Sequence, residues 1–268
     1  MTALDIADLA VLVVEPSRAQ ALVLGAHLGA LGVTGVRYAA DAATALAELG
    51  RAPADLVIST MHLPDGTGAE LIQRLRADPA LALLPFMLVC SEKGYKYLEP
   101  VRQAGAVAIL DKPVDEGRLR QALYSTLDLI VPEDLAAVHP EIVHFNVLVV
   151  DDSPTARALI CSVLENLGVR RLSVAENGRA AMERVDSEVF DLVVTDLNMP
   201  EMDGEALVRY IREESNQPEL PVLLVTSETN ESRLTAVQQA GVSALCNKPF
   251  EPAVVRDILE RVLTFGRV

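Results

Sequence analysis

Five residues with chemically active side chains each stand at the end of a short apolar run. They are Asp151, Asp152, Asp196, Thr226 and Lys248. Carboxylates that converge within a few ångströms repel one another, so three of them need a divalent cation or a lysine as a counter-charge. A site made only of oxygen ligands suits Mg²⁺, which keeps several waters and accepts phosphoryl oxygens. The residue set therefore predicts a pocket where a carboxylate attacks a phosphoryl group while a metal ion, a lysine and a threonine hold its charge.

These residues need a scaffold that brings strand ends together, and the apolar pattern predicts one. Short β-branched runs, such as VLVVD at 147–151 and DLVVTD at 191–196, indicate strands buried on both faces. Between the runs, apolar residues recur three and four positions apart, as in residues 156–168, which indicates helices. Five strands alternating with five helices predict an α/β fold with a doubly wound parallel sheet. In such a sheet the crevice lies beyond the C-terminal strand ends, where all five residues fall.

The chain contains two copies of this unit, offset by 136 residues (11 to 147) with no gap. The matching segments include VLVVEPS at 11–17 and VLVVDDS at 147–153, QAGA at 103–106 and QAGV at 239–242, and Lys-Pro at 112–113 and 248–249. A repeat of this length is a domain rather than a solenoid unit. We therefore predict a first domain at 1–131, a linker at 132–145 and a second domain at 146–268.

Composition and charge restrict the partners and the compartment. The net charge of −15 argues against a nucleic-acid surface, which needs clustered Lys and Arg. The charge is uneven, because residues 1–131 hold 15 acids and 11 bases (net −4), whereas residues 132–268 hold 23 acids and 12 bases (net −11). No apolar stretch approaches the ~20 residues of a membrane-spanning helix, and the acidic N-terminus lacks the basic region of an export signal. Three isolated cysteines are typical of reduced, buried thiols, so we expect a cytoplasmic protein that contacts neither membrane nor nucleic acid.

The second copy resembles the receiver domain of bacterial two-component response regulators. The motifs that carry the resemblance are the acidic pair at 151–152, Asp196, Thr226 and Lys-Pro at 248–249, each at a strand end and in the receiver order. The resemblance covers residues 146–265 with the full motif set and residues 10–130 with a partial one. It implies a two-component signalling protein made of two (βα)₅ receivers.

The resemblance also implies a role for each position. Asp196 would accept a phosphoryl group from the phosphohistidine of a histidine kinase, from a phosphotransfer protein or from a small acyl phosphate. Thr226 and Lys248 would bind the phosphoryl oxygens, and the Lys-Pro peptide bond at 248–249 would be cis, which proline permits. The implied Mg²⁺ ligands are Asp152, Asp196, the backbone carbonyl of Asn198 and, through a water, Asp151.

The first copy departs from this motif set at each chemically decisive position. Glu15-Pro16 replaces the acidic pair, Thr60 stands in place of the nucleophile, and Cys90 replaces the hydroxyl donor. Lys112 remains, and we expect Glu15 to be its partner. A threonine is a poor phosphoryl acceptor without an activating base. We therefore expect a pseudoreceiver that has kept the scaffold and serves docking or dimerisation.

Two segments depart from the regular pattern. Residues 132–145 contain two prolines and lose their periodicity, so we expect a linker into which the last helix of the first copy extends for a turn or two. Pro100 falls inside the expected fourth helix of the first copy. A proline within a helix costs ~3 kcal/mol, so we expect this helix to begin late or to be kinked.

The leading hypothesis is a response regulator without a DNA-binding or catalytic output domain, because we expect the sequence to end, at Val268, directly after the last receiver helix. Phosphorylation would then switch a surface that binds a downstream protein or a second copy in a homodimer. A phosphate sink, and a regulatory tandem receiver related to cyclic-dinucleotide cyclases, stay open as alternatives. A haloacid-dehalogenase-like phosphatase is disfavoured, because it needs an Asp two positions after the nucleophile and this chain has Asn198 there. We therefore expect no catalytic turnover beyond the receiver's own phosphorylation and dephosphorylation.

Overall fold

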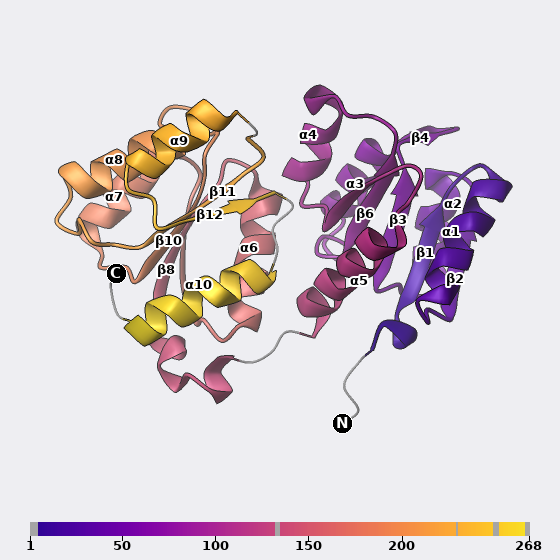
Figure 1. Ribbon diagram of the computed structural model, residues 1–268, viewed down its shortest axis with the longest axis horizontal. Helices are drawn as coiled ribbons and strands as arrows, with labels where there is room; N and C mark the ends of the chain where they lie inside the picture. Colours follow the sequence, from indigo (N-terminus) through magenta and orange to yellow (C-terminus); the bar gives the residue numbers. More distant parts are fainter. Residues whose placement is uncertain (1–4, 132–134, 229, 249–251, 266–268) are drawn as a thin grey trace. The chain divides into compact units, whose positions relative to one another are not determined.

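The chain divides into two compact units, Met1–Val131 and Pro132–Val268. The computed structural model describes residues 5–131, 135–228, 230–248 and 252–265. Each unit has a five-stranded parallel sheet flanked by helices, which confirms the predicted fold class (Figure 1). None of the helices in the described part of the chain combines the length and the apolar character that crossing a membrane requires.

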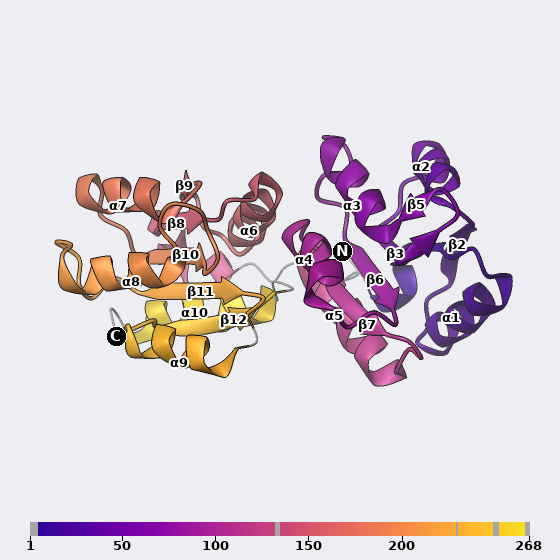
Figure 2. The ribbon, with the colours of Figure 1, turned by 90° about the horizontal axis from the view of Figure 1, so that it is seen from above.

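The first unit is built around a sheet whose strands follow the spatial order β2-β1-β3-β6-β7, of which Figure 2 labels β2, β3, β6 and β7. The strands are β1 (Ala10–Val14), β2 (Gly35–Ala39), β3 (Leu56–Thr60), β6 (Phe86–Cys90) and β7 (Ala108–Asp111). The helices are α1 (Arg18–Ala30), α2 (Ala42–Arg51), α3 (Gly68–Ala77), α4 (Tyr95–Gln103) and α5 (Glu116–Ile130). A 3₁₀ helix (Ile6–Asp8) precedes the sheet, and a short antiparallel pair, β4 (His62–Leu63) and β5 (Gly66–Thr67), follows β3.

The second unit repeats this arrangement, with the strand order β12-β11-β10-β8-β9. Its strands are β8 (Asn146–Val150), β9 (Arg171–Ala175), β10 (Leu192–Asp196), β11 (Val222–Thr226) and β12 (Ala244–Asn247). Its helices are α6 (Pro154–Asn166), α7 (Gly178–Ser187), α8 (Gly204–Glu213), α9 (Glu231–Gln239) and α10 (Pro252–Phe265).

The repeat extends to the pairing of individual residues in the sheets. Val11 of β1 pairs with Leu56 of β3, and the equivalent Val147 of β8 pairs with Leu192 of β10. All strands in the two large sheets are parallel, because each connection crosses a face of the sheet as a helix. The sequence pattern of unbroken apolar strands follows from this cover on both faces.

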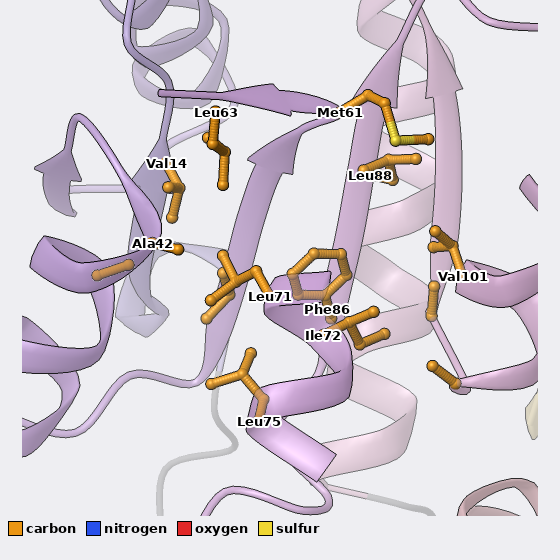
Figure 3. Packing of buried hydrophobic residues seen from close by; sticks show 14 of the residues in the cluster. Val14, Ala42, Met61, Leu63, Leu71, Ile72, Leu75, Phe86, Leu88 and Val101 are labelled. Carbon is orange, nitrogen blue, oxygen red and sulfur yellow. The ribbon is translucent and has the colours of Figure 1, made fainter. Parts of the chain in front are cut away.

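The core of the first unit has two layers separated by the sheet, because successive strand residues point to opposite faces. Leu12 and Val14 of β1 belong to the layer beneath α2, α3 and α4, whereas Val11 and Val13 belong to the layer beneath α1 and α5. Figure 3 shows the first of these layers, in which the fully buried ring of Phe86 lies beside the apolar side chains of α3. Burying one large apolar side chain stabilises the fold by about 1.5–3 kcal/mol, so these layers hold the strand ends rigidly.

The last helix of the first unit does not extend into the segment 132–145, so that part of our expectation is wrong. α5 ends at Ile130, where Val131 caps it with a bond to the Leu127 carbonyl. The described part of the segment instead forms two 3₁₀ helices, Leu135–Ala137 and Pro140–His144.

These 3₁₀ helices pack against the second unit at the end of α6. A side-chain carbon at Gly168 would lie 3.0 Å from Cγ2 of Ile142 and 3.2 Å from Cβ of Ala136. Ile142 is fully buried, as is most of Leu135. Gly168 also has φ +106, a conformation that glycine adopts without strain. Most of the predicted linker is therefore ordered structure that belongs to the second unit.

Helix α4 begins where its counterpart does, so the expectation of a late start is wrong. Its bounds, Tyr95 and Gln103, are the repeat equivalents of those of α9. Pro100 lies inside the helix, and the Ala104 N–H donates to its carbonyl at 3.1 Å, which continues the helical pattern to the last turn. The loss of one N–H donor is therefore absorbed within a helix of unchanged length.

Candidate functional site

The strand order brings the predicted residues to one edge of the second sheet. β8 and β10 are neighbours at the sheet centre, and the chain moves outward from them in opposite directions, to β9 and to β11. A crevice forms outside the C-terminal strand ends at such a reversal. Asp151 directly follows β8, while Asp196 and Thr226 end β10 and β11.

A buried ionic cluster lies at this edge. Asp151 is 0% exposed, Asp196 is 1% exposed and Lys248 is 7% exposed. The Lys248 ammonium donates to Oδ2 of Asp151 at 2.9 Å and to Oδ2 of Asp196 at 2.8 Å. One lysine thus compensates two carboxylates whose burial would otherwise be very costly.

Asp152 adds a third carboxylate to the cluster. It is exposed, and one carboxylate oxygen from each of Asp151, Asp152 and Asp196 lies within 4.8 Å of the others. Three carboxylates and one ammonium leave a formal charge of −2 (one positive minus three negative). That excess is the charge that a divalent cation neutralises.

Thr226 is the last residue of β11, and Asn198 lies in the loop after β10. Thr226 is 1% exposed, and its hydroxyl oxygen accepts a bond from the Glu228 N–H at 3.0 Å. Asn198 is half-buried in the loop between β10 and α8, two residues after Asp196. The Lys-Pro bond at 248–249 lies outside the described residues.

The charge states follow from burial and proximity. Burial raises the pKa of Asp151, the Asp196 carboxylate raises it further, and the Lys248 ammonium opposes both effects. Burial alone would lower the pKa of Lys248, but the carboxylates of Asp151 and Asp196 outweigh burial and raise it. The lysine is therefore protonated at neutral pH and is a fixed positive charge for any anionic group that enters the crevice.

The backbone after β10 holds the Asp196 carboxylate from its other side. The Leu197 N–H donates to Oδ1 of Asp196 at 2.7 Å, so Oδ1 is held by the backbone and Oδ2 by the lysine. A side-chain carbon at Gly204 would lie 2.3 Å from the Asp196 carbonyl oxygen. Glycine is therefore required there for α8 to begin so close to the end of β10.

Comparison with known proteins identifies the family of this fold and site. The profile of the response regulator receiver domain matches residues 11–124 and 147–260. The chain belongs to the response regulator receiver family. The two matches fall within the two units, so the protein is a tandem receiver response regulator.

Similar proteins include two chemotaxis proteins. Chemotaxis protein CheY1 of Helicobacter pylori is 39% identical over 117 residues, which cover 43% of this chain and 94% of that protein. Chemotaxis protein CheY of Pseudomonas aeruginosa is 38% identical over 122 residues, which cover 46% and 97%. A solved structure described as a probable two-component system response regulator/GGDEF domain protein is 22% identical, with a TM-score of 0.43, and covers 95% of this chain and 98% of that one.

The first receiver carries a different cluster at the equivalent edge. The Lys112 ammonium donates to Oε2 of Glu15 at 2.9 Å, to Oγ1 of Thr60 at 3.1 Å and to the side-chain oxygen of Gln20. The pairing of Lys112 with Glu15 was predicted and is confirmed. These three acceptors take up all three ammonium hydrogens. One acid and one base leave this cluster without net charge.

The remaining positions of this edge carry no metal-binding set. Pro16 follows Glu15 where a second carboxylate stands in the other receiver. Cys90 ends β6, and burial raises the pKa of its thiol, so the thiol is neutral. Within the described residues, three acidic, histidine or cysteine groups come together in the second receiver, and the first receiver has no such group. Its Lys112–Pro113 bond is cis.

Two contacts at these edges were not predicted from the sequence. Arg157 of α6 donates to the backbone carbonyl of Asp151, and the side-chain oxygen of Gln20 of α1 accepts from the Lys112 ammonium. A signal was available in the ungapped repeat, because Arg157 stands opposite Ala21 and Gln20 opposite Ala156. Both differences fall in the first turn of the helix that follows the first strand of each unit, α1 in the first and α6 in the second.

Proposed function

We propose that the second receiver accepts a phosphoryl group on Asp196 in a Mg²⁺-dependent reaction and thereby switches a protein-interaction surface. The observation that carries this proposal is the buried Lys248 that bridges Asp151 and Asp196 at the C-terminal edge of the sheet. Membership of the receiver family supports it. We further propose that the donor is a histidine kinase, a phosphotransfer protein or an acyl phosphate, and that the protein acts in the cytoplasm.

The donor set fits Mg²⁺. Two oxygens bound directly to one Mg²⁺ lie at most about 4.2 Å apart, which is twice the bond length. The three carboxylate oxygens lie within 4.8 Å of one another. They could therefore hold the ion if they moved slightly closer together, or if one of them bound it through a water. The residues that would hold the ion are Asp151, Asp152, Asp196 and the backbone carbonyl of Asn198. When bound, the ion supplies positive charge to the phosphoryl oxygens.

The chain's own residues account for the transfer step. A carboxylate oxygen of Asp196 attacks phosphorus, and the new P–O bond forms as the bond to the donor breaks. The electron pair of the broken bond stays with the donor, on the histidine nitrogen or on the acyl oxygen. Lys248, already protonated, moves from neutralising Asp196 to neutralising the phosphoryl oxygens. The hydroxyl of Thr226 can donate to another of these oxygens.

The experiment is phosphorylation of the full chain by acetyl phosphate with Mg²⁺, followed by intact mass. We expect one phosphoryl group per chain, its loss in Asp196→Ala, and its retention in Asp257→Ala, which removes an exposed carboxylate of α10. Omission of Mg²⁺ should reduce the modification strongly. Modification that persists in Asp196→Ala would overturn the assignment of this residue.

Association state and competition then distinguish the kinds of output. A change in association on adding beryllium trifluoride and Mg²⁺ supports a switched binding surface, with the first receiver serving docking or dimerisation. An unchanged association state, together with a shortened phosphorylation lifetime on another regulator of the same kinase, identifies a phosphate sink. We propose a phosphoryl acceptor rather than an enzyme, so sustained Asp196-dependent hydrolysis of phosphoesters would contradict this function.

A further inference from the structure

A second group of ion pairs lies beside the phosphorylation edge of the second receiver, centred on Arg233 of α9. The guanidinium of Arg233 lies 3.4 Å from Oε2 of Glu228 and 3.5 Å from Oδ2 of Asp203. Glu228 lies two residues after the end of β11, and Asp203 directly precedes α8. Arg233 therefore ties the chain that leaves β11 to the first turn of the helix that follows β10.

Asp203 holds one side of Arg233 on a fixed part of the receiver. Its Oδ1 accepts from the Ala206 N–H at 2.9 Å as the N-cap of α8, while its Oδ2 faces the arginine. The next residue, Gly204, donates its N–H to the Leu197 carbonyl at 2.9 Å. The start of α8, and with it the Asp203 carboxylate, is thus joined to the residue that directly follows β10.

Glu228 connects the other side of Arg233 to a residue of the site. The Glu228 N–H donates to Oγ1 of Thr226 at 3.0 Å, and its Oε1 accepts from the Asn230 N–H at 2.8 Å. A hydroxyl oxygen that accepts one bond directs its own hydrogen elsewhere. By holding Glu228, Arg233 therefore helps to fix the direction in which the Thr226 hydroxyl donates.

The first receiver keeps the scaffold but has lost these ion pairs together with the phosphorylation residues. At three repeat positions it has Thr67, Cys90 and Tyr97, against Asp203, Thr226 and Arg233. The glutamate remains, as Glu92, and its partner is His62 at 2.5 Å. Strand order and register are the same in the two receivers, so a tie needed only for the fold would be expected in both. Its restriction to the second receiver indicates a role in the chemistry at Asp196.

We propose that Arg233 is a positioning residue for phosphoryl transfer to Asp196, and that it acts through Glu228 on the hydroxyl of Thr226. This inference rests on the proposed phosphorylation of Asp196 and adds a residue of α9 to it. Ion pairs as exposed as those of Arg233 contribute little to stability, so the receiver should fold without them. The same small free energy, applied to a group that contacts the transferring phosphoryl, changes the rate severalfold.

The test is the rate of phosphorylation of the full chain by acetyl phosphate at saturating Mg²⁺, followed by intact mass at increasing donor concentration. Arg233→Met should lower the maximal rate by about threefold to tenfold. Arg233→Lys keeps the charge and should recover part of the rate. In a Thr226→Ala background, Arg233→Met should change the rate by less than about twofold, because the hydroxyl through which it acts is gone.

Two further variants complete the experiment. Arg209→Met is the matched control, because Arg209 of α8 forms the same kind of exposed ion pair, with Glu205 of its own helix. This control should be phosphorylated at the rate of the unaltered chain. Asp203→Asn keeps an N-cap acceptor for α8 but removes the charge beside Arg233, and should lower the rate by about twofold or more. Thermal unfolding shows whether each variant folds, and Asp203→Asn replaces Arg233→Met if that variant does not.

The outcomes separate this inference from the proposed function. An unchanged rate in Arg233→Met would overturn the inference and leave phosphorylation at Asp196 in place. An effect of full size in the Thr226→Ala background would do the same, since Arg233 would then act on the fold or on the charge of the crevice. If the unaltered chain is not phosphorylated at all, the proposed function fails and this inference fails with it.

Discussion

A lysine after the last strand stands at the same repeat position in both receivers, yet its neighbours give it different roles. Lys248 faces the two buried carboxylates of Asp151 and Asp196 and leaves the cluster with a negative excess. Lys112 faces one carboxylate, that of Glu15, and is otherwise satisfied by neutral oxygens. The first arrangement can take up a cation and a phosphoryl group, whereas the second is already neutral.

Replacing Lys248 should therefore destabilise its receiver more than replacing Lys112 destabilises the other receiver. Lys248→Met leaves two buried carboxylates unpaired and should destabilise the second receiver by about 3–5 kcal/mol in the presence of EDTA. Lys112→Met should cost less, because its side chain is 26% exposed and one carboxylate is left. Mg²⁺ should restore part of the loss in Lys248→Met only, since the ion replaces the missing positive charge. Urea unfolding followed by circular dichroism measures the free energy of unfolding of each variant with and without Mg²⁺. An equal gain in stability of the two variants on adding Mg²⁺ would contradict this prediction.

At the scale of elements, each receiver ties its third helix to the neighbouring loops with one arginine. Arg76 of α3 donates to the carbonyls of Leu84 and Gly105, and Arg212 of α8 makes the equivalent contacts in the second receiver. Burial lowers the pKa of Arg76 to about 10, so it remains charged at neutral pH. The helix that follows β3 is thereby joined both to the loop before β6 and to the end of α4.

Arg76→Leu should destabilise the first receiver by about 2–4 kcal/mol, because several carbonyls lose a charged donor. Arg74→Leu is the matched control, since Arg74 lies two residues before Arg76 on the same helix and is exposed. Its effect should stay within about 0.5 kcal/mol. Chemical denaturation of both variants measures the free energy of unfolding. An equal decrease in the two variants would show that the carbonyl contacts of Arg76 contribute little.

A second link between elements joins α7 to α8 and depends on pH. The Tyr210 hydroxyl donates to Oδ1 of Asp186 at 2.5 Å, and this bond raises the pKa of Tyr210 to about 12. The stabilisation from this bond is therefore fully present below the unfolded pKa of about 10 and is lost as the pH rises towards 12.

The tyrosinate absorbance difference between the unaltered chain and Tyr210→Phe isolates this ionisation. We expect it near pH 12, and in an Asp186→Asn background we expect it closer to 10. The stability advantage of the unaltered chain over Tyr210→Phe should shrink across the same interval. A Tyr210 ionisation that Asp186→Asn does not move would show that the carboxylate is not its cause.

At the scale of the whole molecule, the two receivers share strand order and register but not chemistry. Thr60→Asp in an Asp196→Ala background should therefore leave the chain unphosphorylated by acetyl phosphate. Pro16 still offers no second acidic ligand, and Cys90 offers no hydroxyl. The triple change Thr60→Asp, Pro16→Asp and Cys90→Thr should regain measurable phosphorylation, because it rebuilds the site around Lys112. Intact mass measures both, and a phosphorylated single change would show that the first receiver lost only its nucleophile.

The fold and the identity of the site residues could be read from the sequence because they depend on local pattern. Unbroken apolar strands, helical spacing and an ungapped repeat predicted two parallel sheets, and the strand ends located Asp151, Asp196 and Thr226 at one edge. The departures at Pro16, Thr60 and Cys90 were visible in the same comparison, as was the pairing of Lys112 with Glu15.

Other features depended on contacts between distant segments, which no local pattern specifies. The bond of Lys112 to Gln20 spans 92 residues and was not predicted, because Gln20 lies on α1 and not at a strand end. The 3₁₀ helices on Gly168 and the unchanged length of α4 around Pro100 likewise reflect packing that overrides local preference.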